Sequence, residues 1–334
     1  MARLDELRLM TKIARMYYEQ GLTQNEITDR LGIHQSTVSR VMKRAQQEGI
    51  IRIVINVPSG THPELEEALQ STFGLKDAVV VDSIDDEEQI VRDLGAAAAF
   101  YLENALKPKD VIGISAWSAA LLAMVEAMHP TQRAAGTHVV QILGGIGSPG
   151  SDAHATHVTR RLAGLISGEA TLLPGPGIVG SAEARTVMME DQFVRKAMKL
   201  FQQLTVALVG IGAIEPSKRL AASGNVFSPQ ELKLLSSKGA VGDICLRFYD
   251  DAGQPVVTPL NDRVISIELR QLQQVKRVIG VAGGRRKTAA IRGALEGMLI
   301  NVLITDIWTA GRLLEGAQTD SSRNRSNSNN AYRK

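Results

Sequence analysis

The sequence predicts an α/β protein in which a small all-α helix-turn-helix domain precedes a doubly wound, mostly parallel sheet domain. Three observations predict this fold class. Residues 1–49 carry apolar side chains at helical spacing, as at Leu4, Leu7 and Ala14. From His62 to about Gly316, strand-like and helix-like stretches alternate, as in a parallel sheet with crossover helices. Most strand-like stretches are unbroken apolar runs, which is typical of strands that helices cover on both faces.

The expected elements follow in chain order. Residues 50–55 predict a strand, and residues 58–60 predict a linker. Further strands are expected at 78–81, 111–115, 138–143, 171–173, 206–209, 244–249, 277–282 and 302–305. Helical stretches, among them 87–106, 119–128 and 288–299, separate several of these strands, and residues 248–257 predict an inserted hairpin. We therefore expect a DNA-binding domain at 1–57, a ligand-binding and oligomerisation domain at 58–316, and a disordered polar tail at 317–334.

Residues 23–41 carry the most specific local pattern. Thr23 followed by Glu26 is a capping box that begins a helix, and Gly32 allows a tight left-handed turn after it. Apolar residues at five spaced positions form the buried side: Ile27, Leu31, Ile33, Val38 and Val41. The pattern predicts a helix-turn-helix whose second helix enters the major groove of double-stranded operator DNA.

Polar and basic residues occupy the outward positions of this motif. Hydroxyl and amide groups suit base edges, and lysine and arginine suit phosphates. The predicted DNA contacts are Thr23, Gln24, His34, Gln35, Ser36, Thr37, Ser39, Arg40, Lys43 and Arg44. The alternative is an ordinary helical hairpin with a polar outer face, but the joint occurrence of all these features favours DNA binding. Thr28 departs from the pattern, because such helices usually carry alanine there for close packing.

The charge distribution agrees with this division. Of the 38 basic and 35 acidic residues, nine and six lie in 1–57, and four and one lie in 317–334. This leaves 25 basic and 28 acidic residues for 58–316, so only the small N-terminal module is basic. A DNA-packaging protein is not expected, because the large domain carries no excess of positive charge.

The cysteine count and the hydropathy indicate the cellular compartment of the protein. A single cysteine, Cys245, excludes an intramolecular disulfide framework and a thiolate metal cage. No segment has the approximately 18 consecutive apolar residues that span a bilayer, and the N-terminus lacks the apolar core of a signal peptide. We expect a soluble, cytoplasmic protein without a membrane partner.

Glycine-rich loops follow several of the predicted strands, where ligands collect in open α/β sheets. They lie at 144–150, 174–177, 210–212 and 283–287, and several open a helix whose free N–H groups can bind an anion. The loops therefore indicate a small phosphorylated ligand, although each is also explained as a tight turn. Lys287 sits where it can meet a phosphate. Asp243 can accept hydrogen bonds from hydroxyl groups, and Gln141 needs a polar partner if it is buried.

Other ligand classes fit the sequence less well. Gly145-x-Gly147-x-x-Gly150 matches a dinucleotide fingerprint formally, but Pro149 interrupts it and no acidic residue ends the next strand. Residues 283–288 lack the glycine spacing of a nucleoside-triphosphate loop. His154 and His157 lie on one helix face, but no nearby ligand completes a metal site, so His154 is expected to contact a polar ligand. No metal or cofactor is expected.

Residues 5–316 resemble the SorC family of bacterial sugar-operon transcriptional regulators. The resemblance lies in the helix-turn-helix at 23–41 and in a series of segments that occur in family order along the chain. These segments are Val140–Gly145, His154–Thr156, Leu173–Pro174, Val206–Gly212, Gly239–Cys245, Val281–Gly284 with Lys287, and Leu299–Asp306. The resemblance implies a sugar-binding domain of the sugar-phosphate isomerase and deaminase type, usually tetrameric assembly, and operator binding that a phosphorylated sugar controls.

The resemblance also implies roles for individual residues. By position, Ser115, Ala116, Trp117 and Ser118, together with Gly144 and Gly145, would surround the phosphate. Asp243 would meet the sugar hydroxyls, and Lys287 the charged end of the ligand. The loop Ser115–Ala120 departs from the commoner family pattern, in which a glycine and a threonine occur.

Two functions remain in competition. The first is a ligand-controlled transcription regulator of a carbohydrate operon, which is not an enzyme. The alternative is a sugar-phosphate isomerase or deaminase fused to a DNA-binding module. Catalysis needs a general base with a supporting neighbour, and Asp243 and His154 have no spacing that ties them into a unit. The first function is therefore favoured. The sequence does not identify the sugar, whether it is phosphorylated, the operator or the sign of regulation.

Overall fold

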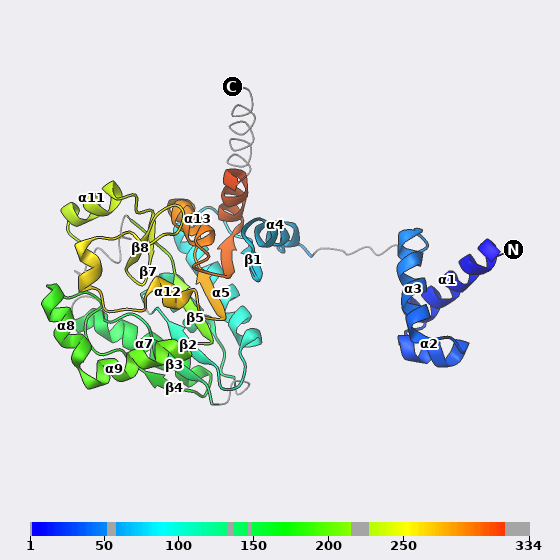
Figure 1. The fold of residues 1–334 in the computed structure, drawn as a ribbon, viewed down its shortest axis with the longest axis horizontal. Helices are drawn as coiled ribbons and strands as arrows, with labels where there is room; N and C mark the ends of the chain where they lie inside the picture. The colour runs from blue at the N-terminus through cyan, green and yellow to red at the C-terminus, as the bar shows by residue number, and fades with distance from the viewer. Residues whose placement is uncertain are drawn as a thin grey trace, which may run out of the picture. The chain divides into compact units, whose positions relative to one another are not determined.

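The computed structural model divides into two compact units, Met1–Pro58 and Ser59–Lys334 (Figure 1). It describes residues 2–51, 58–115, 117–131, 136–145, 149–214 and 227–317, and of residues 149–155 only the backbone. The predicted tail at 318–334 lies outside the described residues. So does most of the strand expected at 50–55, of which only Ile50 and Ile51 are described, and neither is in a strand.

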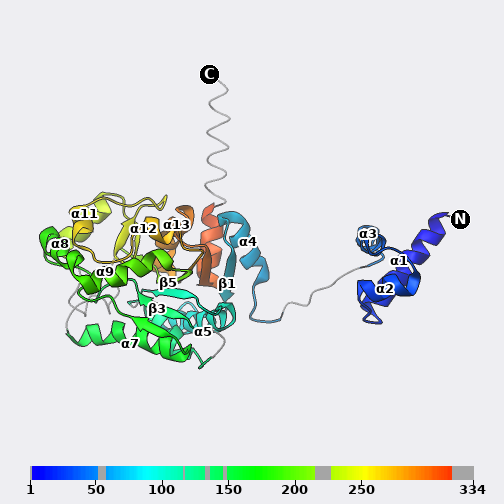
Figure 2. The same ribbon diagram turned by 60° about the horizontal axis from the view of Figure 1, so that its bottom comes forward.

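The N-terminal unit contains three helices, α1 (Ala2–Tyr18), α2 (Gln24–Leu31) and α3 (Gln35–Gln47) (Figures 1 and 2). Ile27 of α2 and Val38 of α3 are fully buried and pack against Ile13 and Met16 of α1. Met42 and Ala45 extend the buried side of α3 by one more turn than the sequence predicted. The expected helical domain is therefore confirmed, with α1 supplying most of the surface that the motif packs on.

A seven-stranded parallel sheet forms the centre of the second unit. Its strands are β1 (Asp77–Val81), β2 (Val111–Ile114), β3 (His138–Gln141), β4 (Glu169–Thr171), β5 (Val206–Gly210), β9 (Arg277–Val281) and β10 (Val302–Asp306), in the order β1-β10-β9-β5-β2-β3-β4. Every neighbouring pair is parallel. The chain reverses its direction of progress across the sheet between β2 and β5, which makes this the switch point where such sheets bind ligands.

Helices cover both faces of this sheet. The helices described in this unit are α4 (Pro63–Phe73), α5 (Glu87–Ala105), α6 (Ala119–Ala127), α7 (Pro149–Leu165), α8 (Ala182–Glu190), α9 (Gln192–Lys199), α11 (Pro229–Ser237), α12 (Leu269–Leu272), α13 (Thr288–Glu296) and a last helix at 307–317. Leu235 of α11 belongs, with Phe248, to a small separate cluster away from this sheet. One core contains Leu94 of α5 and Leu121 of α6. The other contains Leu69 of α4 and Ile291 of α13. The predicted doubly wound architecture is confirmed.

A second, three-stranded antiparallel sheet packs beside the first. It consists of β6 (Gly212–Ala213), β7 (Gly242–Ile244) and β8 (Arg247–Tyr249). The single strand expected at 244–249 is wrong, because the chain turns back at Cys245 and Leu246. The expected hairpin at 248–257 is present as an antiparallel bridge between Tyr249 and Pro255.

Strand β4 also lies two residues earlier than expected. It pairs with β3 along one side only, from Glu169 to Thr171, and its first two residues are exposed. An edge strand is held by backbone hydrogen bonds and does not need apolar side chains on both faces, so the apolar run at 171–173 does not mark the position of β4. Within the described parts of the chain, no helix has both the length and the apolar character to cross a membrane.

Candidate DNA-binding surface and effector cavity

The helix-turn-helix begins with the predicted capping box. Thr23 Oγ1 accepts a hydrogen bond from the Glu26 N–H, and the Glu26 carboxylate accepts one from the Thr23 N–H at 2.7 Å. The hydrogen bonds that the Thr23 N–H and hydroxyl donate to this carboxylate lower the pKa of Glu26. Gly32 has φ 64°, a left-handed conformation that costs glycine little, and its N–H donates to the Thr28 carbonyl. The Thr28 hydroxyl donates to the Gln24 carbonyl at 2.8 Å, which allows a hydroxyl in place of the usual alanine.

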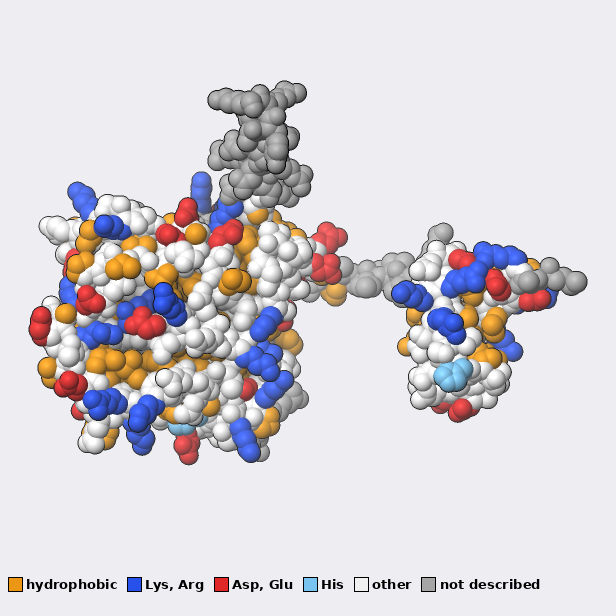
Figure 3. Space-filling model, viewed as in Figure 1, with side chains coloured by type: hydrophobic (Ala, Val, Ile, Leu, Met, Phe, Trp, Pro, Cys, Tyr) orange, Lys and Arg blue, Asp and Glu red, His pale blue; other side chains and the backbone are white. Residues whose placement is uncertain are grey.

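The outer face of α3 is polar and exposed. Gln35, Ser36, Ser39, Arg40 and Lys43 are exposed, and Thr37 is half-buried. The helix begins after His34, whose Nδ1 accepts a hydrogen bond from the Ser36 N–H. In Figure 3, Lys and Arg side chains are prominent on the visible face of this unit, with acidic side chains among them.

Several of the predicted DNA contacts already have hydrogen-bond partners within the protein, among them Thr23, His34 and Arg40, whose Nε donates to the Ser36 carbonyl at 3.2 Å. Arg44 donates to Glu48 at 2.8 Å and to Glu6 at 3.1 Å, and so ties α3 to α1. Gln24 lies near Met42 Sδ and is half-buried. A phosphate would have to compete with two carboxylates for Arg44. Lys43, in contrast, has no hydrogen bond or ion pair to another described side chain.

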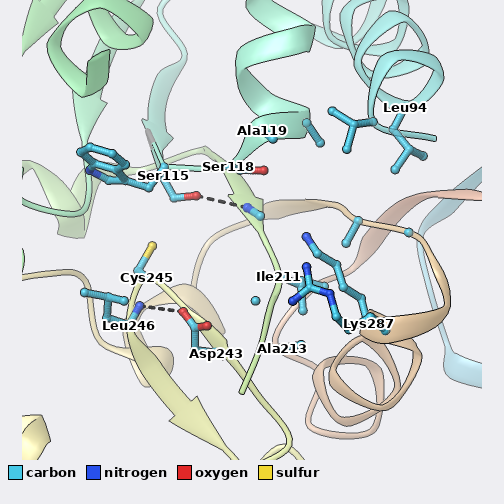
Figure 4. Close-up of a pocket in the computed structure, with 18 of the residues that line it drawn as sticks. Leu94, Ser115, Ser118, Ala119, Ile211, Ala213, Asp243, Cys245, Leu246 and Lys287 are labelled. Carbon is cyan, nitrogen blue, oxygen red and sulfur yellow. Dashed lines mark hydrogen bonds between the residues drawn. The ribbon is translucent and has the colours of Figure 1, made fainter. Parts of the chain in front are cut away.

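A cavity of about 160 Å³ lies at the carboxyl ends of β2, β5 and β9, beside the switch point (Figure 4). It is smaller than the several hundred Å³ typical of drug-sized ligands, so it suits a small molecule. Its lining residues come from five loops and from α5: Glu87, Val91, Leu94, Ser115, Trp117, Ser118, Ala119, Ala120, Leu143, Gly210, Ile211, Gly212, Ala213, Asp243, Cys245, Leu246, Ala282, Gly283, Arg286 and Lys287.

Two serines connect the ends of β2 and β5 at this cavity. Ser115 Oγ accepts a hydrogen bond from the Gly210 N–H at 3.1 Å. Ser118 caps α6, accepting a hydrogen bond from the Leu121 N–H. A Cβ at Gly210 would lie 2.5 Å from Ser118 Cβ, so glycine is required for this close approach. The first turn of α6 therefore faces the cavity with its positive dipole end.

Asp243 enters the cavity from β7. Its Oδ2 accepts a hydrogen bond from the Leu246 N–H at 3.0 Å, and its Oδ1 lies so close to Gly212 that a Cβ there would overlap it. Burial raises the pKa of Asp243 to about 6, although the Leu246 N–H and the charge of Lys287 both lower it. At neutral pH the carboxylate is mostly ionised and can accept hydrogen bonds from ligand hydroxyls.

Lys287 enters from the short 3₁₀ turn Arg285–Lys287 that leads into α13. Its side chain has no hydrogen bond or ion pair to another described residue. Burial lowers the pKa of Lys287 and the neighbouring Arg286 lowers it further, whereas Asp243 and Glu87 act in the opposite direction. Arg286 pairs with Glu87 at 2.9 Å beside it. An anion in the cavity would stabilise the charged form of Lys287.

The loop before Lys287 is anchored by two residues that the sequence analysis did not assign to the site. Asp306 is fully buried at the end of β10, and its Oδ2 accepts hydrogen bonds from the Gly284 N–H at 2.8 Å and the Thr309 hydroxyl at 2.7 Å. A Cβ at Gly283 would overlap this carboxylate. The sequence signal for this role was the position of Asp306, an acidic residue at the end of an apolar strand.

The structure brings together only part of the predicted effector site. Ser115, Trp117, Ser118, Asp243 and Lys287 line the cavity. Gln141, Gly144 and Gly145 do not: Gln141 is buried with its amide donating to the Leu143 carbonyl, and the two glycines pack against residues 175–177. Ala116 lies outside the described residues, as does the side chain of His154.

Comparisons with known proteins agree with this architecture. The family model of the sugar-binding domain matches residues 59–315, and that of the homeodomain-like domain matches residues 4–53. The sorbitol operon regulator of Klebsiella pneumoniae is 36% identical over 94% of this chain and its own full length. The deoxyribonucleoside regulator of Bacillus subtilis is 32% identical over 93% of this chain and 98% of its own.

Solved structures give the same result. The crystal structure of the full-length sorbitol operon regulator SorC from K. pneumoniae superimposes with a TM-score of 0.70, at 35% identity, and covers 93% of this chain and 99% of its own. The sugar-binding domain of the DeoR regulator from Pseudomonas syringae is 42% identical and gives a TM-score of 0.61. It covers 76% of this chain and all of its own.

The helix-turn-helix unit and the α/β unit with its small cavity at the switch point define a DNA-binding transcriptional regulator with a sugar-binding domain. These relatives are transcriptional regulators, and each matches this chain over nearly its whole length. This protein is therefore a regulator and not an enzyme. The chain belongs to the SorC family of sugar-operon transcriptional regulators.

Proposed function

We propose that this protein controls a carbohydrate-catabolism operon by binding its operator through α3, and that a phosphorylated sugar in the cavity changes the affinity for the operator. The observation that carries the proposal is the presence of Lys287 and Asp243 in one small cavity at the switch point of the sheet. A cation and a hydroxyl acceptor in one cavity match the two kinds of polar group on a sugar phosphate.

The phosphate would lie between Lys287 and the first turn of α6, where Ala119 and Ala120 line the cavity. The free N–H groups and dipole of a helix start favour an anion, and the lysine ammonium neutralises it. Asp243 would accept hydrogen bonds from the sugar hydroxyls. The other polar side chains of the cavity have partners within the protein, since Ser115 and Ser118 accept backbone hydrogen bonds and Arg286 pairs with Glu87. The contacts of Lys287 and Asp243 would therefore decide the affinity.

For the DNA, we propose contacts from the exposed face of α3. Gln35, Ser36, Thr37 and Ser39 would reach base edges, and Arg40 a base or a phosphate. Lys43 would contact the DNA backbone with Thr23, Gln24 and His34 near the helix starts, whereas Arg44 would first have to leave Glu6 and Glu48.

We also propose that the protein is a tetramer assembled through residues 58–316. A single helix-turn-helix makes few contacts, and paired half-sites a helical turn apart need at least two copies. The large unit exposes Phe100, Val187 and Phe193 at 71%, 69% and 62%, which supplies apolar surface for such an assembly.

The test for the effector is calorimetry with a panel of sugar phosphates. Replacing Lys287 by Ala should weaken the binding of the best ligand about tenfold or more, because a charge-assisted contact contributes roughly 1.5–3 kcal/mol. Lys238→Ala is the matched control, because Lys238 is exposed and does not line the cavity. Unchanged affinity in Lys287→Ala would remove this residue from the site. A wild type that binds no sugar phosphate would disprove the ligand class.

A further inference from the structure

The turn between β7 and β8 has a strained backbone. Cys245 and Leu246 have φ of 55° and 60°, in the left-handed region that non-glycine residues avoid, and both are buried. Two-residue hairpin turns of this kind usually contain asparagine and glycine. The other described non-glycine residues with positive φ, Lys109, Ser167 and Met298, are isolated and exposed. The turn is thus unusual in its sequence and in its place beside a cavity.

Contacts on both sides hold this turn in place. Arg247 follows Leu246, is almost fully buried, and pairs with Glu268 at 2.7 Å while donating to Ser266 Oγ at 3.1 Å. On the other side, the Leu246 N–H donates to Asp243 Oδ2. Strained residues that the surrounding structure holds in this way are frequent at ligand sites. Here the left-handed turn presents the Leu246 N–H to Oδ2 of Asp243, and Oδ1 accepts no hydrogen bond from another described residue.

The turn also gives the cavity an apolar end. The side chains of Cys245, Leu246 and Leu143 line the cavity and present only carbon and sulfur atoms. In Figure 4, Cys245 and Leu246 lie on the opposite side of the view from Lys287, with Asp243 between them. The Ser115 hydroxyl also lies at this end, but it already interacts with the Gly210 N–H and with the Cys245 sulfur. A ligand hydroxyl here would lose its hydrogen bonds to water without gaining a partner from Cys245, Leu246 or Leu143.

We propose that Leu246 is a specificity-determining residue, and that the turn selects sugar phosphates with a deoxy carbon (CH₂ in place of CHOH) beside the hydroxyl bound by Asp243. The deoxy carbon lies at the end of the sugar away from the phosphate. The inference rests on the proposed function, because it takes Lys287 as the phosphate end of the site. Leu246 would distinguish deoxy from hydroxylated sugar phosphates, which Lys287 and Asp243 alone do not do.

The test uses two matched pairs of ligands that differ by one hydroxyl. They are 2-deoxyribose 5-phosphate against ribose 5-phosphate, and 2-deoxyglucose 6-phosphate against glucose 6-phosphate. For at least one pair, calorimetry on the full-length protein should give the deoxy ligand about tenfold tighter binding, the factor expected for one unpaired buried hydroxyl. In Leu246→Asn the preference should fall to about threefold or less, because asparagine tolerates the left-handed backbone and supplies a hydrogen-bonding group.

Met298→Asn is the matched control, because Met298 also has a positive φ but is exposed and outside the cavity. It should keep the wild-type preference. Leu246→Gly serves as a second variant, and a single cooperative thermal transition shows that each variant is folded. Equal binding within both pairs, or a preference for the hydroxylated ligand, overturns the inference and leaves the proposed function standing. If none of the four ligands binds but another sugar phosphate does, the inference again falls alone. If no sugar phosphate binds at all, both fall.

Discussion

Asp243 and Lys287 carry opposite charges in one small cavity, and burial shifts the pKa of each toward its neutral form. The two groups therefore lose hydration without a direct ion pair to compensate for it. A ligand with an anionic group and hydroxyls would satisfy both. Residues at binding sites commonly lower the free energy of unfolding of the ligand-free protein in this way.

Replacing Asp243 by Asn should stabilise the protein at pH 7.5 by on the order of 2–3 kcal/mol. The pKa is about 6 in the folded protein, above the ordinary value of 3.8, so the folded state favours the protonated acid. This stabilising contribution is complete below about pH 4 and is lost as the pH rises through 6. Urea denaturation between pH 4.5 and 7.5 should show the loss in the wild type and in the exposed control Asp251→Asn, but not in Asp243→Asn. The same pH dependence in all three proteins would contradict the pKa shift.

Replacing Arg40 by Ala should weaken operator binding by about 1–3 kcal/mol if its side chain reads a base. Lys43→Ala should cost less and should reduce the slope of log affinity against log salt by about one. Gel-shift titrations at several salt concentrations measure both effects, with Arg92→Ala on α5 of the large unit as the control. Sugar-phosphate binding should not change in any of these variants. Wild-type operator affinity in Arg40→Ala and in an Arg40→Ala, Gln35→Ala double variant would exclude this face of α3.

At the level of elements, the anchored loop that leads into α13 positions Lys287. Gly284 has φ 90° and lies against Asp306 and Thr309, so the loop has little freedom to relax. Asp306 at the end of β10 and Thr309 in the last helix thus hold the loop of Lys287, which lies about twenty residues earlier in the chain. The site depends on this tertiary contact as much as on the lysine itself.

Asp306→Ala should lower the free energy of unfolding by about 2–4 kcal/mol, because it leaves two or three buried donors without an acceptor. It should also weaken sugar-phosphate binding at least about tenfold, since Lys287 would lose its fixed position. Chemical denaturation and calorimetry measure the two effects. Thr305→Val is the matched control, because Thr305 is equally buried and its hydroxyl lacks a hydrogen-bond partner among the described residues. Effector affinity that is unchanged in Asp306→Ala would show that the loop does not need this anchor.

The elements predictable from the sequence are those with a strong local signal. The Thr23 capping box, the Gly32 turn and the apolar strands of the large sheet other than β4 are predictable in this way, because each depends on neighbours in the chain. The turn at Cys245–Leu246 was missed because neither residue favours a left-handed backbone, and only tertiary contacts hold them there.

The same distinction applies to the cavity. Lys287 was expected there because the ends of parallel strands meet at one edge of the sheet, and Asp243 because of the resemblance to the SorC family. Cys245 was not assigned to the effector site by the sequence analysis. It is buried, with a thiol pKa that burial raises, but it also lines the cavity. Asp306 and the pair of Glu87 with Arg286 were not assigned to the site. Their roles depend on contacts between residues 22 and 199 positions apart, which no local pattern encodes.

At the level of the whole molecule, the chain combines a DNA-binding unit with a larger unit that binds the effector. Residues 58–316 contain 25 basic and 28 acidic residues, and charges of both signs lie on the visible face of the larger unit (Figure 3). Communication between the units therefore has to occur through a change in conformation or assembly that the effector favours.

The protein should be a tetramer at micromolar concentration, and a fragment of residues 58–334 should keep the same assembly. The exposed apolar side chains of the large unit supply the contact surface. Light scattering on both proteins measures the mass directly. A monomer that still binds its operator with full affinity would contradict the proposal.

The most direct test of the account measures operator affinity with and without the bound effector. Fluorescence anisotropy with labelled operator DNA should show that the sugar phosphate found by calorimetry shifts the operator dissociation constant about fivefold or more, the usual range of such coupling. In Lys287→Ala the operator should bind as well as in the wild type without effector, and the shift should need about tenfold more sugar phosphate. An operator affinity that a saturating sugar phosphate leaves unchanged in the wild type would contradict the account.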